Sequence, residues 1–115
     1  MKKYILRFSQ SNKSSRASFK NLGNRSKKIE TRAGSPKFKN IQKGERLVLV
    51  CGKEKFEKKV KKATTFKTID SMLLKYKLVD IMPELETKAE LKKAYFSYPG
   101  YKEKIKKFGL IALEI

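Results

Sequence analysis

A single carboxylate, Glu30, stands among 13 lysines and arginines in the first 44 residues. It lies in the run 27–32, where two β-branched residues alternate with charged ones and favour an extended strand. Because strand side chains alternate between two faces, Lys28, Glu30 and Arg32 are expected to share a face. Such a group is either an ion-pair network that relieves self-repulsion or a polar site that reads the donor groups of a ligand.

The positive charge is concentrated in the N-terminal part of the chain. Residues 1–68 hold 21 basic and 4 acidic side chains, whereas residues 69–115 hold 9 and 7, within a net charge of +19. A general lysine bias explains the count but not this asymmetry. Such a field captures polyanions, of which nucleic acids and anionic membrane surfaces are the common ones. The candidate contacts to a nucleic-acid backbone are Arg25, Lys37, Lys39, Lys58, Lys59, Lys61 and Lys62, although the last four also fit a solvated face of a strand.

The residue types exclude several kinds of chemistry. The chain has no histidine and one cysteine, so the usual zinc ligand sets and the Ser-His or Cys-His nucleophile pairs cannot be assembled. We therefore expect no metal and no cofactor. Cys51 lies in an apolar run and fits a small buried side chain in a reducing compartment. No segment approaches the roughly 20 apolar residues of a membrane span, so the expected location is cytoplasmic, and a monomer is favoured.

The pattern of elements predicts a single α+β domain over residues 1–115. The expected strands are 4–8, 27–32, 47–51, 56–66 and 110–115, with 47–51 central, covered on both faces and paired with the following ribbon. The expected helices are 17–22, 69–76, 88–98 and 101–108. Thr87 and Glu90 match a capping box, and the aromatic spacings in the last third favour core packing.

Four motifs, in this order, give the chain a resemblance to a known family. They are Lys27-x-Ile29-Glu30-x-Arg32, FKNIxKGE at 38–45, SYPGY at 97–101 and FGLIALE at 108–114. Together they resemble the ASCH domain, a member of the PUA-like superfamily. The resemblance implies a small mixed β-barrel of about five strands with flanking helices. It also implies a cleft lined by the Lys-x-x-Glu-x-Arg strand, with Lys27, Lys28, Glu30 and Arg32 binding RNA or a modified nucleotide.

One bacterial branch of that family consists of N4-acetylcytidine amidohydrolases with a Lys, Thr and Glu triad. The resemblance places the lysine at Lys27 and the late glutamate at Glu84, but the threonine position holds Glu30. The branch's nucleophile is therefore missing, and a non-enzymatic RNA-binding or modified-nucleotide-binding module is the leading hypothesis. One alternative is a small hydrolase that acts on a modified nucleoside or RNA and uses Lys27 with Glu84 or Glu30 as acid/base groups. Another is an adaptor that binds acidic proteins or membranes through charge alone.

Overall fold

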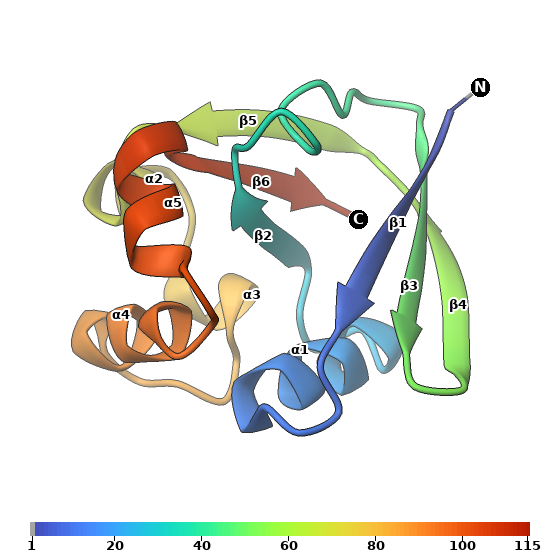
Figure 1. The fold of residues 1–115 in the computed structure, drawn as a ribbon, viewed down its shortest axis with the longest axis horizontal. Helices are drawn as coiled ribbons and strands as arrows, with labels where there is room; N and C mark the ends of the chain where they lie inside the picture. Colours follow the sequence, from blue (N-terminus) through green and yellow to red (C-terminus); the bar gives the residue numbers. More distant parts are fainter. Residues whose placement is uncertain (1) are drawn as a thin grey trace.

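Two three-stranded sheets form the centre of the computed structural model, which describes residues 2–115 (Figure 1). The strands are β1 (Lys3–Phe8), β2 (Ile29–Ala33), β3 (Arg46–Cys51), β4 (Glu54–Lys59), β5 (Lys62–Phe66) and β6 (Leu110–Glu114). The first sheet has the order β1-β3-β4, with β1 parallel to β3 and β3 antiparallel to β4. The second has the order β2-β6-β5 and is antiparallel throughout.

Strand β6 separates two hydrophobic cores because both of its faces are buried. Ile111 and Leu113 point into the core shared with the first sheet, and Leu110 and Ala112 point into the core beneath the later helices. All four side chains are at most 1% exposed. The predicted closing strand is confirmed, and the alternation follows from the two-residue period of a strand.

The number of strands differs from the prediction, because the ribbon expected over 56–66 is two strands in two sheets. The chain turns a corner at Val60 and Lys61: the Val60 amide donates to the Glu45 carbonyl, and the Lys61 amide donates to the Glu114 carbonyl. Val60 is 1% exposed and belongs to the first core, so its burial fixes the corner. The predicted pairing of the 47–51 strand with the start of the ribbon is confirmed.

Strand β3 is central in its sheet, as predicted, but it is not fully covered on both faces. Leu47, Leu49 and Cys51 are buried, whereas Val48 and Val50 are half-buried. The continuous apolar run concealed an alternating pattern, since a valine on a partly exposed face looks the same in the sequence as a core valine.

Helix α1 (Lys13–Gly23) begins four residues earlier than predicted. Asn12 caps it, because its side-chain oxygen accepts a hydrogen bond from the Ser15 amide at 2.9 Å. The serine- and asparagine-rich stretch before the predicted helix therefore supplies the cap and the first turn. Phe19 and Leu22 then anchor the helix in the first core.

The remaining helices are α2 (Ile69–Lys75), α3 (Leu78–Ile81), α4 (Lys88–Phe96) and α5 (Tyr101–Phe108). Capping boxes begin α2 at Thr68 and α4 at Thr87, which confirms the predicted starts. The four-residue helix α3 was not predicted because it is too short to show a period. Gly109 ends α5 with a φ of 69° beside the Phe66 carbonyl, where no side chain fits.

The predicted α+β class is confirmed. The two sheets have separate hydrogen-bonded ladders, and no ladder closes them into a barrel within residues 2–115. In that same range no helix has the length and apolar content needed to cross a bilayer.

Candidate functional site

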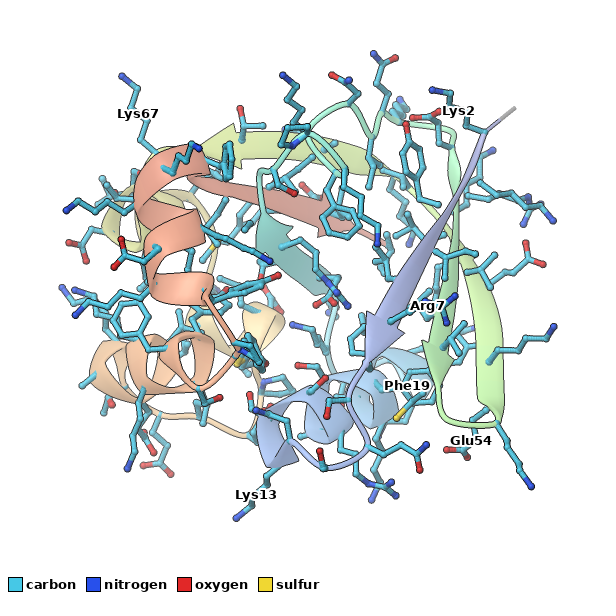
Figure 2. All side chains as sticks on the ribbon, in the orientation of Figure 1. Lys2, Arg7, Lys13, Phe19, Glu54 and Lys67 are labelled. Atoms are coloured by element: carbon cyan, nitrogen blue, oxygen red, sulfur yellow. The ribbon has the colours of Figure 1, made fainter. Side chains whose placement is uncertain are left out.

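A cavity of about 170 Å³ opens beside β2, between the end of β1 and the segment that joins α4 to α5. Its walls include Glu30 and Arg32 from β2, Ser15 and Ser18 from α1, and the rings of three tyrosines from the region of α4 and α5. The end of β1 that carries Arg7, labelled in Figure 2, forms another side. The sequence therefore brings residues from four separate segments to one hollow.

Glu30 is the buried acid of this cavity and is 3% exposed. Its Oε1 accepts a hydrogen bond from the Thr31 amide at 3.0 Å and pairs with the Lys27 ammonium at 3.5 Å. Its Oε2 pairs with Arg32 Nε at 3.2 Å. A buried carboxylate needs such partners because desolvation otherwise makes its charge costly.

Lys27 is the cation beneath Glu30, and its side chain is fully buried. The ammonium donates a short hydrogen bond to the Ile81 carbonyl in α3 and faces Glu30 on its other side. Burial lowers the pKa of Lys27, while the charges of Glu30 and Glu84 oppose that shift. Lys27 thus connects α3 to β2 and compensates the acid from inside the fold.

Arg32 is the cation at the mouth of the cavity, and 14% of its side chain is exposed. A guanidinium NH2 group donates to the Arg7 carbonyl at 3.1 Å. The guanidinium carbon lies 4.6 Å from the centre of the Phe8 ring and 5.8 Å from that of Phe38. Stacking and pairing together hold the guanidinium in one orientation beside Glu30.

Three tyrosines form the wall opposite β2. The Tyr95 hydroxyl is 2.5 Å from Thr31 Oγ1, the Tyr98 hydroxyl is 3.0 Å from Ser14 Oγ, and the Ala33 amide donates to the Tyr101 hydroxyl. The Tyr98 and Tyr101 rings meet edge to face, with centroids 5.2 Å apart. Burial raises the pKa of Tyr98 to about 12 and raises the pKa of Tyr95 and Tyr101 as well. All three hydroxyls are therefore neutral at physiological pH.

The structure changes the expected partner of Glu30. Strand β2 begins at Ile29, so Lys27 and Lys28 lie outside its ladder and do not follow its alternation. The Lys27 amide bonds to the Asn21 carbonyl, and the Lys28 amide bonds to the Asp80 carbonyl. As a result Lys27 is buried beside Glu30, and the Lys28 side chain is exposed and turned away from the cavity. The predicted shared face of Glu30 and Arg32 is confirmed; its extension to Lys28 is wrong.

Glu84 lies outside the cavity. It is exposed, and its carboxylate accepts a hydrogen bond from the Asn21 side chain at 3.3 Å. Its charge acts on Lys27, but the two side chains form no ion pair and line no common hollow.

The candidate nucleic-acid contacts divide into two groups. Arg25, Lys58, Lys59 and Lys61 line a second hollow of about 670 Å³ together with Lys28. The other three, Lys37, Lys39 and Lys62, are exposed elsewhere on the surface.

Sequence reasoning missed Tyr98 and Tyr101 as cavity residues, because their spacing was interpreted as core packing. Tyr95 is a core residue, but the other two are half-buried. A usable signal was the Pro99-Gly100 break between them, since a tyrosine on either side of a chain reversal is placed to face a cavity. Within residues 2–115, no three histidine, cysteine, aspartate or glutamate side chains form a cluster that could hold a metal ion.

The chain is similar to two solved structures over nearly its whole length. The crystal structure of hypothetical protein PH0355 has a TM-score of 0.79 and 25% sequence identity, covering 98% of this chain and 96% of the other. The solution NMR structure of protein PF0455 from Pyrococcus furiosus has a TM-score of 0.70 and 25% identity, covering 98% and 94%. No family model matches the chain, and neither does any curated protein. Neither solved structure carries a name that states an activity.

Proposed function

We propose that this protein is a binding module of the ASCH type, with a PUA-like arrangement of its two sheets, and that the Glu30 cavity receives a nucleobase of RNA or of a modified nucleotide. The proposal rests on one observation above all. A buried acid and a fixed arginine lie side by side on the wall of a small cavity that tyrosine rings complete. Such a site offers an acceptor, donors and aromatic surface, which are the groups that read an unpaired base.

The unused hydrogen-bonding capacity of Glu30 and Arg32 supports this role. Each carboxylate oxygen can accept two hydrogen bonds. Oε1 receives the Thr31 amide and the Lys27 ammonium, whereas Oε2 receives only Arg32 Nε. One acceptor position on Oε2 is therefore open next to the remaining guanidinium donors. A base edge that presents an amino or imino donor next to a carbonyl or ring-nitrogen acceptor complements this pair.

The fixed geometry of the pair supports binding further. Arg32 is held by Glu30, the Arg7 carbonyl and the Phe8 ring, so little side-chain freedom is lost when a ligand arrives. The strongly positive chain attracts a phosphate-bearing ligand over a longer range.

The hydrolase alternative has less support. The ammonium of Lys27 is already bonded to Ile81 and Glu30, and Glu84 points to solvent beside Asn21. Thr31 offers a hydroxyl next to the position of the missing nucleophile, but that hydroxyl is bonded to Tyr95.

Titration of the isotope-labelled protein with unphosphorylated nucleosides tests the proposal. Cytidine, uridine, adenosine, guanosine and N4-acetylcytidine are each added while the signals of Arg32 Nε and of the Tyr98 and Tyr101 rings are followed by NMR. We expect at least one nucleoside to saturate these signals. Chromatography of the N4-acetylcytidine sample for cytidine separates binding from hydrolysis. Absence of any saturable shift at the cavity contradicts the proposal.

Arg32→Lys with Arg46→Lys as the matched control adds a second test. The first change keeps the charge but removes the planar fork, so nucleoside affinity should fall about tenfold or more. Arg46 is exposed on β3, and its replacement should leave the affinity unchanged. Equal affinity in both variants would show that the base does not contact Arg32.

A further inference from the structure

The hollow of about 670 Å³ on the other side of the β2 entrance is the strongest candidate for a second site. It is lined by residues from five parts of the chain: the entrance to β2 at 25–29, the corner between β4 and β5, the end of α2, helix α3 and the end of β6. Six cations line it: the buried Lys27, which is paired with Glu30, and five others, namely Arg25, Lys28, Lys58, Lys59 and Lys61. We call this hollow the cationic groove.

Arg25 is held in the groove by an unusual backbone. It has a φ of 68° and is the only non-glycine residue with positive φ in the described part of the chain. That conformation costs an L-residue about 1–2 kcal/mol. Neighbouring bonds maintain it: the Ser26 amide donates to Asn24 Oδ1 at 2.9 Å, and the Lys27 amide donates to the Asn21 carbonyl at 2.9 Å. The loop therefore presents Arg25 at a fixed place.

Five of the six cations that line the groove have no carboxylate partner. Within the described range, none of the five forms an ion pair with a carboxylate. Two acids do line the groove, but Glu114 accepts a 2.5 Å hydrogen bond from the Tyr76 hydroxyl, and Asp80 stands alone. Burial, followed by the charges of Arg25 and Lys61, lowers the pKa of Lys58, which agrees with cations converging on one space.

We infer that the cationic groove is a phosphate-binding site separate from the Glu30 cavity, with Arg25, Lys58 and Lys61 as its principal contacts. Arginine grips a phosphate through two parallel hydrogen bonds, and the lysines add point charges from the β4–β5 corner. A phosphate would supply acceptors and negative charge to the five cations that have no carboxylate partner. The inference does not depend on a base entering the cavity, because Lys27 and the start of β2 stand between the two hollows.

Two sources could supply the phosphates: a nucleic-acid strand and a free oligophosphate. Both offer closely spaced anionic oxygens, and the groove has room for more than one phosphate group. The experiment therefore uses sodium tripolyphosphate as the probe and a single-stranded oligouridine RNA as the competitor.

The test follows the backbone amide signals of the labelled full chain while tripolyphosphate is added at fixed ionic strength. We expect saturable shifts confined to 25–28 and 58–61. If the RNA reverses them, strand phosphates occupy the groove; if it binds elsewhere and leaves them unchanged, the groove takes a free oligophosphate. Weak shifts spread over all surface lysines would overturn the inference, because they report the general field of the protein alone.

A pair of triple variants with equal charge separates the site from the field. Arg25→Gln/Lys58→Gln/Lys61→Gln alters the groove, and Lys37→Gln/Lys39→Gln/Lys53→Gln removes the same charge from exposed positions outside it. Tripolyphosphate affinity should fall about tenfold or more in the first variant and only slightly in the second. Equal losses would refute the groove. Nucleoside binding, read at Arg32 and Tyr98, succeeds or fails independently of this outcome.

Discussion

The Glu30 cavity and the cationic groove differ in how their charges are compensated, although they meet at consecutive residues of β2, Glu30 lining the cavity and Ile29 lining the groove. At the cavity, the buried Glu30 is compensated by the buried Lys27 beneath it and by the half-buried Arg32 at the mouth. In the groove, Lys27 is paired with Glu30, but the five other cations that line it form no ion pair among the described residues. Paired charges hold a site in shape, whereas unpaired charges of one sign favour an incoming counter-charge. The same lysine-rich composition therefore serves two physical purposes.

The largest expected effect on stability comes from removing one of the cations that compensate Glu30. Lys27→Met leaves Glu30 with one cation and removes the bond to the Ile81 carbonyl. We expect the free energy of unfolding to fall by about 3–5 kcal/mol, as when one partner of a buried ion pair is removed. Urea unfolding followed by circular dichroism measures it.

Two companions of this variant keep the result interpretable. Lys28→Met, at the exposed neighbouring position, should change stability by no more than about 0.5 kcal/mol. The double variant Lys27→Met/Glu30→Gln removes the orphaned charge and should be more stable than Lys27→Met alone. A double variant less stable than the single one would mean that Lys27 does not compensate Glu30.

A smaller loss should follow from removing a neutral partner beside the cavity. Tyr95→Phe deletes the hydroxyl that lies 2.5 Å from Thr31 Oγ1, and both groups are buried. A buried hydroxyl left without its partner costs about 1–3 kcal/mol. Thermal unfolding should register this loss, whereas Tyr4→Phe, at a half-buried position on β1, serves as the control. Equal midpoints for both variants would indicate that the Thr31 hydroxyl finds another partner.

In the groove, by contrast, removing a charged side chain should leave the stability of the protein unchanged or increase it. Lys58→Gln removes a cation that stands close to Arg25 and Lys61, so without phosphate the variant should match or exceed the wild type in stability. The gain should be about 0–1 kcal/mol at low salt and should vanish at high salt, where exposed charges are screened. Urea unfolding of both proteins at two salt concentrations measures this difference in stability. A loss of stability that does not depend on salt would mean that Lys58 makes a stabilising interaction in the folded protein.

The smallest effect is a change in the pH dependence of stability. Burial lowers the pKa of Lys27 below its ordinary value of 10.5, so between the two values the unfolded chain binds more protons than the folded one. Stability from this group therefore rises with pH across that window. The difference in unfolding free energy between the wild type and Lys27→Met should grow as the pH rises towards 10.5. A difference that shrinks would contradict burial as the dominant influence on Lys27.

The sequence alone was sufficient for the elements with strong local signals. The capping box at Thr87 and Glu90 marks one helix start, because these neighbouring residues satisfy the free amides of a first turn. The helical spacing of the apolar residues after Thr68 marks another. The closing strand was also predictable, since its apolar run and the preceding glycine are both local. Helix α3 was not, because four residues held by tertiary packing carry no period of their own.

The candidate site was predictable only in part. Glu30 and Arg32 were found from charge and strand alternation, but the choice between Lys27 and Lys28 depended on where the ladder begins. That starting point is set by two backbone hydrogen bonds, from Lys27 to Asn21 in α1 and from Lys28 to Asp80 in α3. No local sequence pattern indicates either bond. Tyr98 and Tyr101 reach the cavity because of the way α4 and α5 pack, and the spacing of residues along the sequence does not predict that packing.

The corner between β4 and β5 makes the two sheets open and unfold together. Val60 and Lys61 bond to opposite sheets through consecutive backbone amides, at 2.8 Å and 2.7 Å. Separating the sheets must break one of these bonds, so both amides should exchange with deuterated solvent only when the whole domain opens. The Lys61 side chain is nevertheless exposed at the edge of the cationic groove. We therefore expect the backbone amide of Lys61 to be among the slowest to exchange, although its side chain lies on the surface. Slow exchange at this position would show that the groove belongs to the part of the fold that opens only in global unfolding.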